Sequence, residues 1–158
     1  MNILFVCTGN ISRSFLAERL LREELSRLGV GDVRVSSAGL FASTGHSADP
    51  QMADYLAENK IPQDPHEARQ ITREDAEWAD LILVMEKDHE RILERMWPDA
   101  GAKVELLGTY LIHGGMVDDI VDPYGLSPYH YRLAQSQITL AVKNLAQKLV
   151  TARGRNHG

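Results

Sequence analysis

Cysteine is nearly absent from this sequence, and Cys7 is the single one. That excludes an internal disulfide and a cysteine-rich zinc site. Long apolar runs are also missing, because those at residues 2–7 and 81–85 are about strand length, far below the roughly 20 residues that cross a bilayer. The chain opens on a strand-like run without the basic segment and cleavage site of a secretory signal. We therefore expect a cytoplasmic protein with no membrane insertion.

Positive charge is scarce as well. The 17 lysine and arginine residues are outnumbered by 22 acidic ones, which leaves a formal net charge of -5 and argues against general nucleic-acid binding. The 158 residues, 44% of them hydrophobic, suffice for one core without disulfides or a structural metal. We predict a single domain over residues 1–152, followed by a disordered polar tail at 153–158.

Strand-like and helix-like segments alternate along the chain. Apolar, β-prone runs lie at residues 2–7, 32–37, 81–85 and 103–107. Helical patterns begin at residue 13, at the Asp49-Pro50 pair, at Thr72, at residue 87 and at Ser127-Pro128. This order predicts an α/β fold, a parallel sheet with helices on both faces and right-handed crossovers. Ligand sites in such sheets lie at the carboxyl ends of the strands, and Cys7 is at one.

The loop between the first strand and the first helix carries the chemistry. Five residues separate Cys7 from Arg13: Thr8, Gly9, Asn10, Ile11 and Ser12. So short a loop can turn its backbone N–H groups toward one tetrahedral anion, beside the positive end of the helix dipole. Arg13 can hold two phosphate oxygens with its planar guanidinium. The spacing therefore predicts a phosphate-binding loop.

The same loop would favour the thiolate of Cys7, which is the nucleophilic form of the side chain. A lone cysteine at the end of a buried strand is usually only a small hydrophobic residue. The loop composition and Arg13 favour the reactive interpretation, because a core turn needs neither. Nucleotide-binding motifs fit poorly, since the loop lacks both the lysine of a P-loop and the three glycines of a dinucleotide fingerprint.

With these motifs the sequence resembles the low-molecular-weight protein tyrosine phosphatases of bacterial type. The matching segments lie at residues 6–14, 36–39, 66–70, 81–87 and 122–124, and they span nearly the whole chain. The resemblance implies a four-stranded parallel sheet, no metal or cofactor, and hydrolysis of phosphotyrosine in proteins. Such enzymes often oppose bacterial tyrosine kinases of exopolysaccharide export, so a phosphotyrosine-containing protein of that kind is the expected partner.

The reaction needs a carboxyl group that protonates the leaving oxygen and later activates water. Asp118, Asp119 and Asp122 share one long loop, and composition alone does not choose among them. The family pattern selects Asp122, with Tyr124 as an aromatic wall of the cleft. It also implies a polar network that holds the loop in shape, made by Asn10, Ser14, Ser37 and His66. Ser14 is expected to hydrogen-bond the thiolate.

The remaining histidines lack the clustering of ligands and are interpreted as surface residues: His46, His89, His113, His130 and His157.

The chain departs from the family pattern at the catalytic loop and at the pocket rim. Ser12 stands where relatives commonly carry a second cysteine that can form a protective disulfide. Phe15 replaces the usual proline, and Ser43 stands where a large apolar wall is common. We expect Leu40 or Phe41 to supply that wall.

Other functions remain open on the same loop. Arginine phosphatases resemble this chain but carry threonine at the position of Ile11, whose apolar side chain suits an aromatic ring better than a guanidinium. A non-catalytic phosphotyrosine-binding module would keep Arg13 and lose the thiol or the acid, whereas both are present here. Arsenate reductases need additional cysteines. Tyrosine phosphatase activity is therefore the favoured prediction.

Overall fold

A computed structural model of the chain describes residues 1–111 and 115–157. Its four strands form one parallel sheet in the order β2-β1-β3-β4. Their bounds are Asn2–Cys7 (β1), Arg34–Gly39 (β2), Leu81–Val84 (β3) and Val104–Leu106 (β4). The α-helices are Arg13–Arg27 (α1), Pro50–Glu58 (α2), Arg73–Trp78 (α3), Lys87–Met96 (α4) and Pro128–His157 (α5). Two 3₁₀ helices, Pro98–Lys103 (η1) and Leu107–Leu111 (η2), flank β4. The predicted fold class is confirmed.

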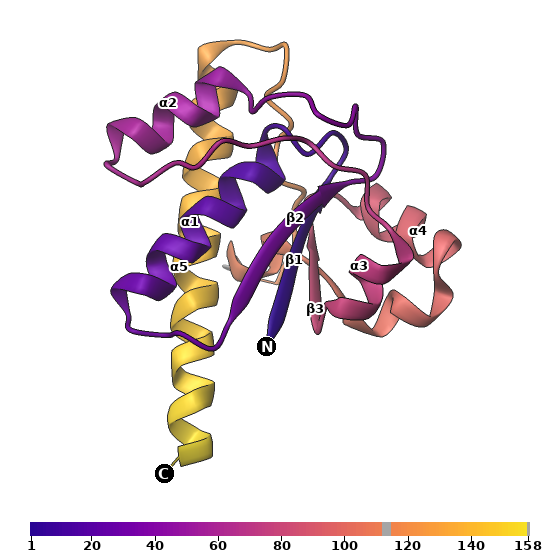
Figure 1. Cartoon of the computed structure of the whole chain (residues 1–158), viewed down its shortest axis with the longest axis vertical. Coiled ribbons are helices and arrows are strands. Elements are labelled where there is room, and N and C mark those ends of the chain that lie inside the picture. Colours follow the sequence, from indigo (N-terminus) through magenta and orange to yellow (C-terminus); the bar gives the residue numbers. More distant parts are fainter. Residues whose placement is uncertain (112–114, 158) are drawn as a thin grey trace.

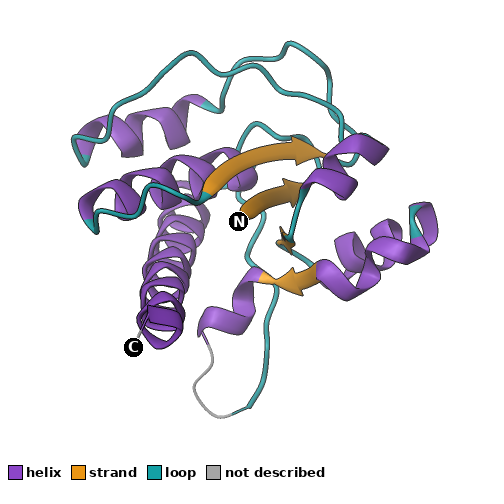
Figure 2. Cartoon of the chain, turned by 60° about the horizontal axis from the view of Figure 1, so that its bottom comes forward, coloured by secondary structure: helices purple, strands orange, loops and turns teal. Residues whose placement is uncertain are grey.

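Helices cover both faces of the sheet, as Figures 1 and 2 show, with α1 and α5 on one side and α3 and α4 on the other. The central strand β1 explains this arrangement, because its alternate residues enter two different cores. Ile3 and Phe5 pack with side chains of α1, α2 and α5. Leu4 and Val6 pack with side chains of α3 and α4. A strand buried on both faces must be apolar throughout, which is why residues 3–7 read as one hydrophobic run.

The predicted boundaries hold best where a local signal sets them. β1 has the predicted bounds, and α4 begins at the predicted residue 87. Asp49 caps α2 by accepting from the backbone N–H of Gln51, and the Thr72/Asp75 capping box at α3 is present in both directions. In contrast, β2 begins and ends two residues later than the predicted 32–37, because pairing with β1 sets its register and places Gly39 opposite Cys7.

The carboxyl-terminal segment differs from the prediction. The sequence predicted a disordered tail at residues 153–158, but α5 continues as a helix to His157. Arg153, about one turn before the end of this helix, forms an ion pair with Asp32, which lies near the start of β2. Gly158 lies outside the described residues. No helix within residues 1–111 and 115–157 is long and apolar enough to cross a membrane.

A buried hydrogen bond fastens α5 to the start of α2. The hydroxyl of Tyr131 donates to Asp49 Oδ2 at 2.6 Å, while Asp49 Oδ1 accepts the capping bond. Both residues are buried. Burial, followed by the hydrogen bond with Asp49, raises the pKa of Tyr131 above its ordinary value, so its hydroxyl remains the donor.

Replacing Tyr131 by phenylalanine should lower the free energy of unfolding by about 1–3 kcal/mol, because the carboxylate of Asp49 would lose a buried partner. Urea denaturation measures this change. Tyr129→Phe is the matched control, since Tyr129 lies on the same helix and is 61% exposed. Equal stability of the two variants would contradict the structural role of this bond.

Candidate active site

The loop from Cys7 to Arg13 lies at the carboxyl end of β1, between that strand and α1. One cavity opens over it and is lined by Cys7, Thr8, Gly9, Ile11, Ser12, Arg13, Asp122 and Tyr124. The first six are consecutive in the chain apart from Asn10, whereas Asp122 and Tyr124 come from the segment ahead of α5. The fold therefore brings together the thiol, the guanidinium and the carboxyl that the sequence analysis singled out.

Arg13 is 2% exposed, and its guanidinium lies next to three polar partners. Its Nη1 donates to the carbonyl of Ile120 at 2.9 Å, and its Nη2 donates to Glu86 Oε2 at 2.6 Å. Asp122 Oδ2 lies 3.5 Å from the same Nη2. Glu86 directly precedes α4, so its role was not apparent from the sequence, where it reads as one more charge at a helix start. This pairing fixes the plane of the guanidinium beside the loop.

A chain of hydrogen bonds leads to the sulfur of Cys7, and its donor directions can be worked out. Asn10 Oδ1 accepts from the backbone N–H of Arg69 at 3.0 Å, which orients the amide so that Nδ2 faces the two serines. That nitrogen donates to Ser14 Oγ at 3.0 Å and to Ser37 Oγ at 2.9 Å. Ser14 Oγ lies 2.9 Å from Cys7 Sγ, so its own hydrogen is left for the sulfur. A donated hydrogen bond stabilises negative charge on that atom.

The far end of this chain is a buried carboxylate that the sequence analysis did not identify. Ser37 Oγ donates to Glu18 Oε1 at 3.0 Å, and Glu18 is 6% exposed. Arg19 Nε at 3.1 Å and Arg22 Nη1 at 3.4 Å balance its charge. An ionised carboxylate can only accept, so Ser37 must donate to it and can only accept from Asn10.

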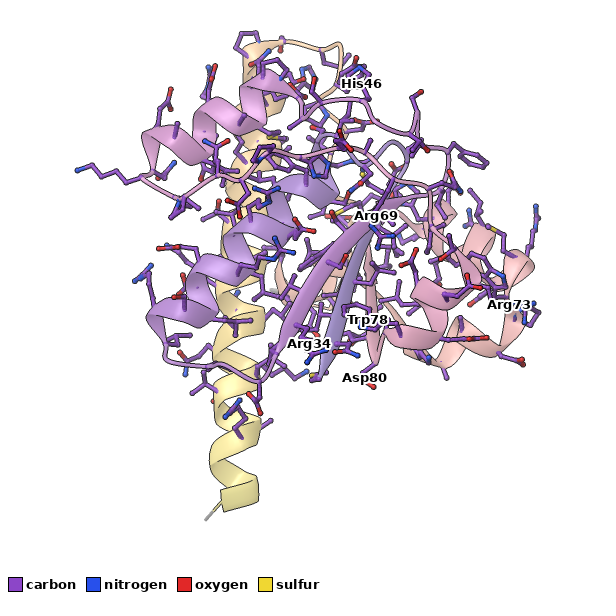
Figure 3. The ribbon with its side chains drawn as sticks, viewed as in Figure 1. Arg34, His46, Arg69, Arg73, Trp78 and Asp80 are labelled. Atoms are coloured by element: carbon purple, nitrogen blue, oxygen red, sulfur yellow. The ribbon has the colours of Figure 1, made fainter. Side chains whose placement is uncertain are left out.

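Asn10 also holds the backbone of the loop in an unusual conformation. Its φ of 58° lies in the left-handed region, which asparagine tolerates better than most residues. The ring nitrogen Nε2 of His66 donates to the Asn10 carbonyl at 2.7 Å, and the His66 ring packs at a tilt against Phe15 with the ring centroids 4.7 Å apart. Figure 3 shows Arg69 near the carboxyl end of β2, whereas Arg34 and Asp80 lie at the opposite end of the sheet. Ser14, Ser37 and His66, the other residues of the predicted network, thus each form a hydrogen bond with Asn10.

The pocket rim differs from expectation. Ile11 and Tyr124 line the cavity as predicted, but Leu40 is 2% exposed and packs in the core against the face that α3 and α4 cover. Phe41 is 67% exposed and does not line the cavity. Both contribute backbone instead, because their N–H groups donate to the carbonyls of Cys7 and Thr8 at 2.9 Å each. The alternation of side chains along the continued β2 direction turns Leu40 inward.

His89, interpreted as a surface residue from the sequence, is 3% exposed and contacts Thr8 and Glu86. Its helical pattern placed it on α4 but could not show that this turn faces the loop.

Ser12 Oγ is buried and has no hydrogen-bond partner among the described residues. His113 lies outside the described residues.

Residues 2–154 match the family described as low molecular weight phosphotyrosine protein phosphatase. The chain belongs to this family. A protein-arginine-phosphatase of Bacillus subtilis (strain 168) is 36% identical over 149 residues, which cover 94% of this chain and 97% of the relative. The low molecular weight protein-tyrosine-phosphatase Wzb of Escherichia coli (strain K12) is 39% identical over 148 residues, covering 94% and 95%.

Solved structures of the family agree with the fold. One of them, the arginine phosphatase YwlE in a cysteine-to-serine mutant with a phosphorylated active-site serine, has a TM-score of 0.86. It is 35% identical and covers 94% of this chain and 95% of its own. The resemblance recognised in the sequence is thereby confirmed, and with it the assignment of this low-molecular-weight phosphatase to the hydrolases.

Gly39 gives a test of how closely the phosphatase loop is packed. A Cβ at this position would lie 2.9 Å from the Thr8 carbonyl oxygen and 3.0 Å from Asn10 N and Gly9 C, all of them loop backbone. Gly39→Ala should therefore displace the loop and lower kcat/KM for p-nitrophenyl phosphate by roughly 10–100-fold. Gly31→Ala, where an added Cβ meets nothing within 4 Å, is the control. Unchanged kinetics in both variants would show that the loop tolerates displacement.

Proposed function

We propose that this chain is a protein tyrosine phosphatase that works through a phosphocysteine intermediate. The observation that carries the proposal is the convergence of the Cys7 thiol, the Arg13 guanidinium and the Asp122 carboxyl on one cavity. The loop amides and Arg13 bind the phosphoryl oxygens, and the amino-terminal end of α1 adds its positive dipole. A chain with a net charge of -5 can thus bind a dianion at one local site.

In the first step, the sulfur of Cys7 attacks phosphorus and the bond from phosphorus to the tyrosine oxygen breaks. Asp122 enters this step protonated and gives its proton to the leaving oxygen, while Arg13 stabilises the charge on the equatorial oxygens. The side chain of Asp122 is 52% exposed and lies 3.5 Å from Arg13, so it can exchange protons with solvent beside the clamp.

In the second step, water attacks the phosphocysteine and Asp122 accepts a proton from that water. The bond from phosphorus to sulfur breaks, and inorganic phosphate and the Cys7 thiolate are released. The Ser14 hydroxyl, which has its hydrogen available for the sulfur, stabilises this leaving group. The relative with a phosphorylated active-site serine supports a covalent enzyme intermediate at the nucleophile.

Asp122→Ala should lower kcat for a phosphotyrosine peptide by roughly 10²–10⁴-fold, because the leaving oxygen loses its acid. Asp118→Ala, an exposed carboxyl of the same segment, should leave kcat unchanged. Cys7→Ser should abolish turnover and still bind orthovanadate, measured by isothermal titration calorimetry. Appreciable hydrolysis by Cys7→Ser, or equal loss in the two aspartate variants, would overturn the assigned roles.

The residue that carries the phosphate in the substrate is tyrosine in this proposal. The alternative is arginine, because one relative is named as an arginine phosphatase. Ile11 lines the cavity beside Tyr124, so an apolar side chain and an aromatic ring face the group attached to phosphate. This lining suits a phenyl ring through area burial and aromatic contact. A guanidinium would lose hydration there without a hydrogen-bond acceptor from Ile11.

Ile11→Thr tests this preference directly. The hydroxyl opens space and offers an acceptor, so the ratio of kcat/KM for phosphotyrosine over phosphoarginine peptides should fall by about tenfold. Ile11→Val is the matched control, because it also removes volume but adds no polar atom. An unchanged ratio in Ile11→Thr would exclude Ile11 as the selector.

We further propose a cytoplasmic location and a phosphotyrosine-containing protein as partner, such as a bacterial tyrosine kinase of exopolysaccharide export. The free thiol of Cys7 supports the location, since a reducing compartment keeps a nucleophilic cysteine active. The similarity to a protein named as the tyrosine phosphatase Wzb supports the partner class.

A further inference from the structure

His89 lies on the first turn of α4 and faces the phosphate-binding loop. Its Nε2 is 3.1 Å from Thr8 Oγ1 and 3.5 Å from Glu86 Oε2, and its Nδ1 accepts from the backbone N–H of Met85 at 3.3 Å. His89 is buried. It therefore touches both Thr8 of the loop and the Glu86 carboxylate that holds Arg13.

These contacts determine where the ring carries its hydrogen. A backbone N–H can only donate, so Nδ1 must have a free lone pair, and the single hydrogen of the neutral ring is on Nε2. Nε2–H then donates to Thr8 Oγ1, with the Glu86 carboxylate beside it. The protonated ring would set Nδ1–H against the Met85 N–H, so the geometry accommodates the neutral ring alone.

We propose that His89 is a positioning residue of this phosphatase, in which the neutral ring connects Thr8 of the phosphate-binding loop to Glu86, the partner of Arg13. The inference rests on the proposed function, because it concerns how the oxyanion-binding groups are kept in place. His89 contacts the loop from α4, whereas the Asn10 network contacts it from α1, β2 and the segment around residue 66. The loop is thus supported on two sides.

The charges around the ring agree with its neutral form. Burial, followed by the Arg13 guanidinium, lowers the pKa of His89 below its ordinary value, although Glu86, Asp119 and Asp122 act in the opposite direction. In the unfolded chain the ring takes up a proton near pH 6.5. The stabilising contribution of the neutral ring is therefore complete above about pH 6.5 and is lost as pH falls toward the lower pKa of the folded state.

Two amide substitutions separate the two ring nitrogens. His89→Asn places an amide oxygen near the position of Nδ1, so it keeps an acceptor for Met85 and loses the reach to Thr8. His89→Gln places an amide nitrogen near the position of Nε2, so it keeps the donor to Thr8 and weakens the Met85 contact. We expect His89→Asn to lower kcat/KM for p-nitrophenyl phosphate roughly tenfold and to weaken inhibition by orthovanadate in parallel, with Tm close to native. His89→Gln should retain most of the activity.

Thr8→Val completes the design, because it removes the acceptor at nearly constant shape. It should lower kcat/KM by a factor similar to that of His89→Asn, and the double variant should lose little more than either one. In addition, the decrease of Tm between pH 7 and pH 5 should be smaller in His89→Gln than in the native chain. A residue that acted only through packing would change Tm without this coupling to Thr8.

Several outcomes would overturn the proposal. They are native kinetics in His89→Asn, equal losses of activity in His89→Asn and His89→Gln, or losses that multiply in the double variant with Thr8→Val. Failure of the proposed function would look different, because the native chain itself would then hydrolyse neither p-nitrophenyl phosphate nor a phosphotyrosine peptide. In that case orthovanadate affinity, measured by calorimetry across the same variants, still decides the role of His89.

Discussion

Arg13 carries a positive charge with 2% of its surface exposed, and a cation removed from water to this degree is stable only when its N–H groups are paired. Its partners, the Glu86 carboxylate, the Ile120 carbonyl and Asp122, come from two segments far along the chain. Ile120 is held in turn by its N–H bond to the Met85 carbonyl at 2.9 Å. The pairing of one buried cation therefore joins α1 to the residues that follow β3 and to the segment ahead of α5.

This constraint also explains how an acidic protein can bind a phosphate dianion. Exposed carboxylates farther away than about 8–10 Å are largely screened by salt, so a net charge of -5 has little influence inside the loop. The local field is set by the loop N–H groups, the start of α1 and Arg13. Around them, hydrogen-bond directions are fixed by groups that can only accept or only donate, such as Glu18 and the Met85 N–H. These bonds hold the Cys7 sulfur and the loop backbone in defined orientations.

Much of the site was predictable because its parts are adjacent in sequence. Cys7 and Arg13 belong to one strand-loop-helix unit, whose spacing alone indicates an anion site. Asp122 could be chosen over its neighbours only through the family pattern. Glu86 and His89 were missed, because an acidic residue before a helix and a histidine on its first turn are common at exposed helix starts. The wall assigned to Leu40 was wrong, since its side chain continues the inward alternation of β2.

The sequence by itself determined the order of strands and helices, the bounds of β1, the start of α4 and the chemistry of the loop, because caps, periodicity and residue spacing act over a few residues. Only the tertiary structure decided which charges are buried together. Register between strands placed Gly39 against the loop, and packing of α4 against the sheet brought Glu86 and His89 to Arg13 and Thr8. Such contacts join residues more than 70 positions apart, and burial there depends on the whole fold rather than on any local pattern.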